Sequence, residues 1–380
     1  MAKFELPTMQ YESELVSKLF ELERLRAQLG QGTTPEPVFA ELHRLFQLLM
    51  SVVSARIEGN RTTVYEAASD LGVDTTVSNP SDALREIKNI QSAMAFIDSL
   101  PEETDLTHAL LRTLHEIAVT GLVREGDPTP GSYRNVDVAI RRAQHLPPSH
   151  VLLMPELDDL LVFVNQAMIP RSQIVHVAVA HHRFLWIHPF RNGNGRVSRL
   201  LSYFMLRRHR FVSPVGMRTV NPAAVFGSNR AEYLDALAFA DDLSNEGTLR
   251  WTEFFVRGMV ADLGRLVQLQ DFDFVQNRLV KPAIDRFHVA GGVSRAERDA
   301  LKRVIDLESV KAGDLESYFP GSPSLRSQQI RSLLDRELLV PVSPGARRYR
   351  LSFTTRGLLI YVVRQLDEVG YLPTLLREDD

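Results

Sequence analysis

The sequence predicts a mainly α-helical protein made of two to three domains. Apolar residues recur at helical spacing along most of the chain, whereas the alternating pattern of strands is scarce. The chain has 380 residues, of which 44% are hydrophobic and 24% are charged, so it can bury a sizeable core and lacks the composition of a disordered protein. We divide it into an N-terminal helical region over 1–100, a central unit over 101–288 and a C-terminal unit over 289–380.

Helical periodicity is strongest before residue 120. Four segments carry apolar residues three and four positions apart, at 15–29, 38–57, 83–100 and 106–119. Runs rich in Gly, Pro, Ser, Thr and Asp interrupt the helical pattern here and further along the chain, at 30–37, 72–82, 121–132 and 289–294. The last of these runs is the expected boundary of the C-terminal unit.

The segment 135–155 breaks the helical pattern in a different way. Apolar residues alternate in "VDVAI", and Pro147 and Pro148 then mark a turn, so we expect a short β-hairpin. Helical periodicity resumes over 156–168 and 172–187. The stretch "HPFRNGNGRVSR" that follows therefore lies on a loop between two helices.

This stretch has the composition of an anion-binding site. Gly193 and Gly195 allow positive φ and keep side chains away, so that backbone N–H groups at the start of the next helix can point at one anion. Arg196 and Arg199 lie three residues apart on that helix and can supply charged contacts to a di- or triphosphate. His188 can accept a proton from an attacking hydroxyl near neutral pH.

The same stretch resembles the signature of the Fic family, H-P-F-x-[D/E]-G-N-G-R-x-x-R, at every fixed position except 192. The resemblance implies a mainly helical fold and a reaction called AMPylation, the transfer of AMP from ATP to a Tyr, Thr or Ser hydroxyl of a target protein. It also implies the following roles: His188 as catalytic base, Phe190 packing the loop into the core, Gly193, Asn194 and Gly195 as anion hole, and Arg196 and Arg199 on the β and γ phosphates. No P-loop or kinase glycine loop competes for nucleotide elsewhere in the sequence.

Position 192 is where the family carries the carboxylate that contacts Mg²⁺. Asn192 offers only a neutral carbonyl oxygen, and a hard divalent cation prefers charged oxygen ligands. Because Mg²⁺ also takes contacts from substrate phosphates and water, we expect weakened rather than abolished metal binding at Asn192. Transfer of another phosphate-containing group, such as phosphoryl or phosphocholine, is the alternative that this departure leaves open.

The upstream stretch "SARIEGN" resembles the inhibitory motif [S/T]-x-x-x-E-[G/N] of many Fic proteins, with Ser54, Glu58 and Gly59 at the matching positions. A Glu58 carboxylate at a helix end can pair with Arg199 and occupy the arginine that the γ phosphate needs. The resemblance therefore implies an enzyme that is inactive by default. In some relatives this glutamate also helps to remove AMP from the target, so de-AMPylation is a further expectation. The alternative is an ordinary helix C-cap.

The resemblance extends to two further features. The hairpin expected over 135–155 is similar to the Fic flap, which would hold a target segment by strand addition, with an ordinary hairpin as the alternative. Tyr233 matches a family tyrosine near the nucleotide base, although Glu232 and Ala240 depart from the family pattern. Three other histidines are expected to pack or to lie on the surface, because their spacing fits no metal-site motif: His176, His181 and His182.

The C-terminal unit is predicted to contain a helix, a short helix, a helix and a β-hairpin turning at Pro344 and Gly345, which is the element order of a winged helix. Arg326 and Arg331 would lie on the recognition helix and could meet a DNA backbone. Over 321–356 the arginines outnumber the acids by five: Arg326, Arg331, Arg336, Arg347, Arg348, Arg350 and Arg356 against Asp335 and Glu337. We favour docking of this unit on its own chain, on a second copy of the chain or on a target protein.

Composition limits the kinds of site and the cellular location that we expect for this protein. The sequence has no cysteine, which rules out disulfides, thiolate metal sites and thiol nucleophiles and fits a reducing cytoplasm. The first residues lack the apolar core of a signal peptide, and no stretch reaches ~18 uninterrupted apolar residues, so we expect a cytoplasmic protein without a membrane partner. The formal net charge of -3 argues against a generally basic nucleic-acid binder.

Together these features predict an autoinhibited Fic-type protein adenylyltransferase that uses ATP and Mg²⁺ and modifies a target protein or itself. A second hypothesis is a DNA-binding regulator whose Fic core senses nucleotide and has lost the chemistry through Asn192. Salt-dependent binding to duplex DNA without any transfer of label would favour the second hypothesis.

Overall fold

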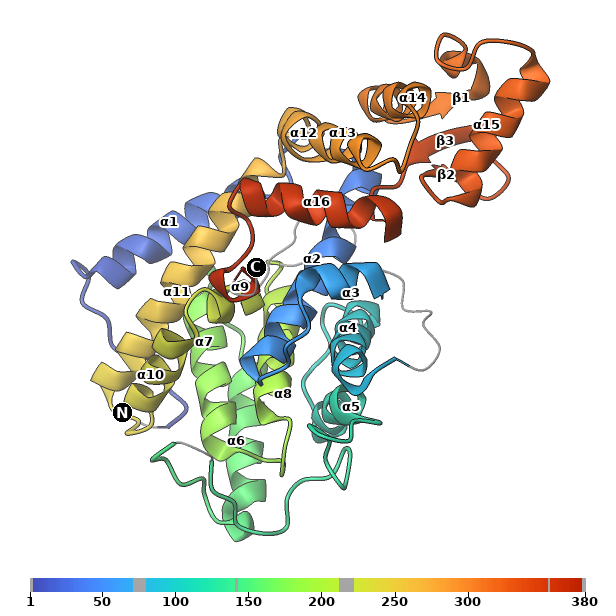
Figure 1. Cartoon of the computed structure of the whole chain (residues 1–380). Coiled ribbons are helices and arrows are strands. Elements are labelled where there is room, and N and C mark those ends of the chain that lie inside the picture. The colour runs from blue at the N-terminus through green and yellow to red at the C-terminus, as the bar shows by residue number, and fades with distance from the viewer. Residues whose placement is uncertain (1–2, 71–79, 141–142, 212–221, 355, 378–380) are drawn as a thin grey trace.

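The computed structural model describes residues 3–70, 80–140, 143–211, 222–354 and 356–377. These residues form a body of helices, from which the elements α14, α15 and β1 to β3 project at one end (Figure 1). The mainly helical fold predicted from the sequence is therefore confirmed.

Four of the five N-terminal helices follow the predicted segments closely, whereas α3 was not predicted. They are α1 (Glu14–Gln28), α2 (Glu36–Ile57), α3 (Val64–Asp70), α4 (Asp82–Ser99) and α5 (His108–Val119). Side chains of Ser13, Ser81 and Thr107 accept hydrogen bonds from the first turns of α1, α4 and α5, so each start is set by a local cap. Most of the predicted break at 72–82 lies outside the described residues.

The central helices include α8, which begins within the signature loop. They are α6 (Leu153–Asn165), α7 (Pro170–Ile187), α8 (Asn194–Arg208), α9 (Pro222–Gly227), α10 (Arg230–Ala240) and α11 (Asn245–Gln268), with a 3-10 turn η1 (His150–Leu152) before α6. Helix α8 packs against α7, α4, α5 and α2, and most of its side chains are buried. This burial on all sides fixes the direction in which the N-terminus of α8 points.

The β-hairpin predicted over 135–155 is absent from the described residues of this segment. Its described residues, which exclude 141 and 142, contain no strand. Instead, the Arg134 guanidinium donates to the carbonyl oxygens of Val136 and Pro148, and the Asp137 carboxylate accepts from the backbone N–H of His150. Prolines lack the N–H groups that a strand ladder requires, and these side-chain bonds hold the two ends of the segment together in its place.

The C-terminal elements begin within the body and end by returning to it. They are α12 (Phe272–Phe274), the π-helical η2 (Val275–Val280), α13 (Lys281–Val289), α14 (Arg295–Asp306), β1 (Val310–Lys311), η3 (Ala312–Leu315), α15 (Pro323–Asp335), β2 (Leu339–Pro341), β3 (Arg348–Leu351), α16 (Arg356–Glu368) and η4 (Thr374–Leu376). The three strands pair antiparallel in the order β1-β3-β2. Helix α16, which was not predicted from the sequence, packs back on α13 and α3.

Helix α2 joins the C-terminal elements to the signature region. The buried Glu41 carboxylate near its start binds Arg350 of β3, with a 2.6 Å Nη1–Oε1 distance, and accepts from the backbone N–H of Phe353. The other end of α2 carries Ser54. By length and composition α2 alone among the described helices could cross a membrane, but 72% of its most apolar stretch is buried inside the protein.

Candidate active site

His188 ends helix α7 in a left-handed conformation, with φ 52° and ψ 62°, and so turns the chain into the signature loop. Its backbone carbonyl accepts a hydrogen bond from Arg134 Nε at 2.8 Å, which fixes the position of the residue. Burial lowers the pKa of His188 to about 4. The imidazole is therefore neutral near pH 7 and can accept a proton.

The loop after His188 is closed by Asn194 and anchored by Phe190. The Asn194 side chain accepts from the Phe190 N–H at 3.0 Å and donates to the Phe190 carbonyl at 2.8 Å. Phe190 is fully buried and stacks on His115, with 3.7 Å between ring centroids. Because the Asn194 side chain is engaged within the loop, only its backbone is left to take part in an anion hole.

The two signature glycines allow close contacts that no other residue permits. Gly193 has a φ of 78°, and a Cβ there would lie 2.7 Å from Val119 Cγ1. A Cβ on Gly195 would lie 2.1 Å from Oε1 of Glu58. The Glu58 carboxylate thus rests directly on the first turn of α8, where the helix dipole and the backbone N–H groups favour an anion.

Arg199 is held by the upstream motif. Its Nη2 lies 2.6 Å from Glu58 Oε1, its Nε donates to Ser54 Oγ at 2.7 Å, and Nη2 also donates to the Ser54 carbonyl. Burial opposes the charged form of Glu58, but Arg199, together with Arg196 and Arg230, holds the pKa of Glu58 below its usual value. The pair predicted from the sequence is therefore present as a charged contact. Gly59, with a φ of 99°, ends the turn after Glu58.

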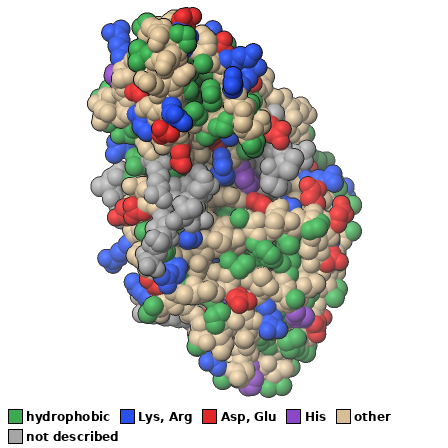
Figure 2. Space-filling model, turned by 90° about the vertical axis from the view of Figure 1, so that its right-hand side faces the viewer, with side chains coloured by type: hydrophobic (Ala, Val, Ile, Leu, Met, Phe, Trp, Pro, Cys, Tyr) green, Lys and Arg blue, Asp and Glu red, His purple; other side chains and the backbone are tan. Residues whose placement is uncertain are grey.

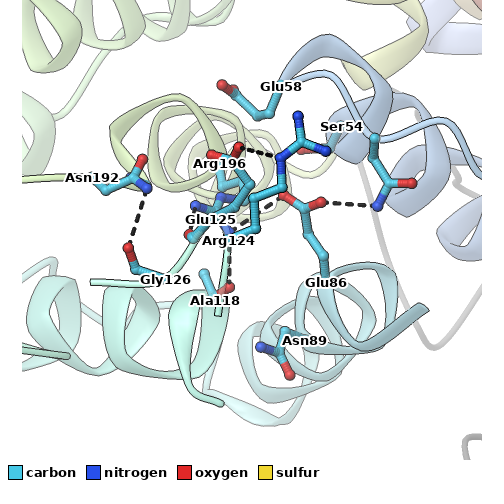
Figure 3. A network of polar contacts seen from close by, with 12 residues as sticks. Ser54, Glu58, Glu86, Asn89, Ala118, Arg124, Glu125, Gly126, Asn192 and Arg196 are labelled. Atoms are coloured by element: carbon cyan, nitrogen blue, oxygen red, sulfur yellow. Dashed lines mark hydrogen bonds and ion pairs between the residues drawn. The ribbon is translucent and has the colours of Figure 1, made fainter. Parts of the chain in front are cut away.

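Arg196 is also engaged by the protein. It is 1% exposed, and its Nη1 lies 3.3 Å from Oε1 of Glu86, a residue of α4 that was not among the predicted site residues (Figure 3). Its Nη2 donates to the Glu125 carbonyl and its Nη1 to that of Ala118. Both signature arginines thus face a carboxylate supplied by the N-terminal region.

Asn192 serves the loop itself. Its Oδ1 accepts from the Gly193 N–H at 2.7 Å, and its Nδ2 donates to the Gly126 carbonyl at 3.2 Å (Figure 3). The Asp127 carboxylate accepts from the Asn192 N–H. Within the described residues no group of three or more His, Asp and Glu side chains could hold a metal ion. The bond from Gly193 uses one of the two lone pairs of the Asn192 oxygen, and the Mg²⁺ contact at Asn192 stays a prediction.

Tyr233 lies in the core, behind Arg199. It is 2% exposed, its hydroxyl meets His181 Nε2 at 3.1 Å, and burial raises its pKa to about 12. A nucleotide base would not reach it there, so this position gives no support to the predicted base contact. The three histidines that were expected to pack are all buried: His176, His181 and His182.

The arginines of the C-terminal unit are less available than their sequence suggests. Arg326 is buried and bound to Glu316, which contradicts the DNA contact predicted for it. Arg336 pairs with Glu297, and Arg350 with Glu41. Arg331 remains exposed. Figure 2 shows basic and acidic side chains interspersed over the visible face, with no expanse of a single sign.

Arg134 is a second residue of the site that sequence reasoning missed. Its side chain bonds to the backbone of both the 135–155 segment and the end of α7. It lies in "GSYRNVDVAI", where an arginine beside a predicted hairpin is typical of an ordinary surface residue. Its burial could be recognised only once the loop and the segment were placed together.

Comparisons with known proteins agree with this geometry. A profile of the Fic/DOC family matches residues 105–206. The Protein adenylyltransferase Fic of Drosophila melanogaster is 31% identical over 203 residues, which are 52% of this chain and 37% of the fly protein. That of Drosophila willistoni is 30% identical, over 52% of this chain and 36% of its own length. This chain thus spans little more than a third of the fly proteins.

Two solved structures share the fold. A Fic family protein from Desulfovibrio desulfuricans superposes with a TM-score of 0.58 at 20% identity, over 92% of this chain and 98% of its own. A Fic domain containing signaling protein from Bacteroides thetaiotaomicron gives 0.52 at 20% identity, over 68% of this chain and 97% of its own. With the signature loop, its two arginines and the matched profile in place, residues 105–206 form a Fic/DOC domain.

Proposed function

We propose that this protein is an adenylyltransferase that transfers AMP from ATP to a hydroxyl of a target protein or of itself, and that Glu58 holds it inactive. The observation that carries the proposal is the Glu58 carboxylate, which rests on Gly195 and pairs with Arg199 where the signature predicts a phosphate. The name of the fly relatives supports ATP as donor. The engagement of Arg326 argues against the DNA-binding alternative.

In the proposed reaction, the neutral imidazole of His188 takes the proton of the target hydroxyl. The hydroxyl oxygen then bonds to the α phosphorus as the bond to the β-phosphate oxygen breaks, and pyrophosphate leaves. The N-terminus of α8 stabilises the charge on the α phosphate, and Arg199 holds the departing phosphates once Glu58 has released it. Arg134 keeps His188 in place through its carbonyl.

The test removes the Glu58 charge and follows the label. Glu58→Gln protein, incubated with ATP labelled at the α or the γ phosphate, should retain label only from the α position. Label should disappear when His188→Ala is added, and the exposed-site control Glu103→Gln should stay as inactive as the unaltered protein. Label retained only from the γ position would contradict AMP transfer and indicate phosphoryl transfer instead.

The pH profile tests His188 as the base. Its depressed pKa keeps the imidazole neutral above about pH 5, and only the neutral form accepts a proton. At saturating ATP, the labelling rate of Glu58→Gln protein should stay level from pH 8 to pH 6 and should fall only as the pH approaches 4. A base with an ordinary pKa near ~6.5 would be about one quarter neutral at pH 6, so a fourfold loss there would contradict the assignment.

A further inference from the structure

Glu86 places a second negative charge against the arginines of the signature. It lies on the second turn of α4 and is 3% exposed. Its Oε1 is 3.3 Å from Arg196 Nη1 (Figure 3). Its Oε2 accepts from Asn60 Nδ2 at 2.9 Å. The carboxylate is therefore buried with one cationic partner and one amide donor.

Arg196 has one donor that the described residues do not satisfy. Its Nη1 and Nη2 bond to backbone carbonyls and to Glu86, whereas the buried Nε has no hydrogen-bond partner among them. A buried donor without a partner is costly, and its presence on the first turn of α8 points to an anionic ligand at that position. Gly195, beside it in the chain, is the residue on which Glu58 rests.

We propose that Glu86 is a second internal carboxylate that competes with the nucleotide for the signature arginines, so that ATP binds Arg196 only when Glu86 is protonated or displaced. The proposal rests on the proposed function, since it assumes that a triphosphate lies along Arg196 and Arg199. Glu58 then blocks one arginine and Glu86 the other.

The surroundings of Glu86 favour the protonated, neutral form of its carboxyl group. Burial raises the pKa of Glu86, Arg196 and the Asn60 amide lower it, and the carboxylates of Glu58 and Glu125 raise it again. An arriving triphosphate adds negative charge beside the same carboxyl and drives it further toward the neutral form. ATP binding is therefore coupled to proton uptake, and affinity should rise as the pH falls.

Asn60 connects the two carboxylates. It directly follows the Glu58-Gly59 turn, and its amide donates to Glu86. A cavity of about 620 Å³ opens beside this contact and is lined by Asn60, Glu86 and Glu125, among other residues. The cavity gives the Glu86 side chain room to move away from Arg196, and a motion of the Glu58-Gly59 turn that displaces Asn60 would change the contact of Glu86.

The test measures nucleotide binding directly, in Glu58→Gln protein, so that the first carboxylate is already neutral. Glu86→Gln keeps the shape and removes the charge, and Glu103→Gln is the matched control at an exposed site. We expect Glu86→Gln to tighten ATP binding roughly tenfold at pH 8 and AMP binding much less, since only ATP places phosphates along both arginines. The ratio of the ATP affinities measured with and without Glu86→Gln should shrink at pH 6. Because both proteins are measured at the same pH, protonation of ATP itself cancels in this ratio.

Unchanged or weaker ATP binding in Glu86→Gln would show that Glu86 only supports the fold around Arg196, and would leave the proposed function intact. A Glu58→Gln protein that is folded and binds no ATP would overturn both proposals. Melting temperatures establish that each variant is folded. If Glu86→Gln does not fold, Asn60→Ala replaces it: loss of the amide raises the pKa of Glu86, so ATP binding should tighten, and a weaker affinity would overturn the inference.

Discussion

At the scale of single residues, Asn192 is the departure from the family signature that the structure explains best. A carboxylate at this position could accept from the Gly193 N–H, but it could not donate to the Gly126 carbonyl as the Asn192 amide does. The amide therefore satisfies one donor and one acceptor of the loop at once. The exchange of Asp or Glu for Asn fits a loop that is fixed by hydrogen bonds.

Asn192→Asp should destabilise the protein. The new carboxylate faces the Gly126 carbonyl without a donor, which we expect to cost about 1–3 kcal/mol and to lower the melting temperature. Asn89→Asp is the control, because the Asn89 amide also donates to a backbone carbonyl but lies nearer the surface. If Asn192→Asp instead raises activity at limiting Mg²⁺ without loss of stability, position 192 binds the metal and does not serve mainly to fix the loop.

Some residues of the site could be predicted from the sequence and others could not. The stretch 188–199 is continuous, so its roles could be inferred from local spacing. Glu86 and Arg196 meet across 110 positions of the chain, and no local pattern links them. One signal was present: Glu86 lies four residues before the buried Ile90 on α4, and a carboxylate on the apolar face of a helix requires a buried partner.

At the scale of elements, the start of α8 depends on a glycine that leaves room for an anion. Gly195→Ala would place a methyl group 2.1 Å from Glu58 Oε1, and the same methyl group would obstruct a phosphate. We expect Gly195→Ala to abolish labelling by Glu58→Gln protein and to weaken ATP binding more than tenfold, as measured by calorimetry. The loss should exceed about 1.4 kcal/mol, the free energy of a tenfold change.

Gly264→Ala is the matched control for this substitution. Gly264 lies inside α11, and an added Cβ there meets nothing within 4 Å. Alanine in a helix interior is favoured over glycine by about 0.8–1.0 kcal/mol, so this variant should keep its activity and melt slightly higher. Equal losses in both variants would mean that the effect of Gly195→Ala is not specific to the anion site.

The helices were predictable because periodicity and caps are local properties of the chain. The conformation of segment 135–155 was not predictable, because Arg134 and Asp137 replace the strand ladder with side-chain bonds that a pattern of apolar residues does not encode. Helix α16 was missed although its sequence is amphipathic, and it is its packing on α13 and α3 that returns the chain to the body. Such contacts join elements that lie far apart in the sequence, so local periodicity does not reveal them.

At the scale of the whole molecule, α2 is in contact with both the signature and the C-terminal elements. Glu41 binds Arg350 and the backbone of Phe353, and Ser54 binds Arg199 at the other end of the same helix. Glu41 and Glu58 are 17 positions apart, or about 25 Å along a helix. The C-terminal elements therefore hold the helix that leads to Glu58, at the end remote from Glu58 itself.

Arg350→Ala tests whether this remote contact controls Glu58. The buried Glu41 would lose its closest cation and keep its backbone donors, which we expect to lower stability by about 1–3 kcal/mol and to reduce the melting temperature. Glu58 should stay in place, because Ser54 and Glu58 hold Arg199 by contacts that Arg350 does not touch. Labelling should therefore remain as low as in the unaltered protein, with Arg331→Ala as the exposed control. Labelling that approaches the level of Glu58→Gln would show instead that the C-terminal elements keep the enzyme inactive through α2.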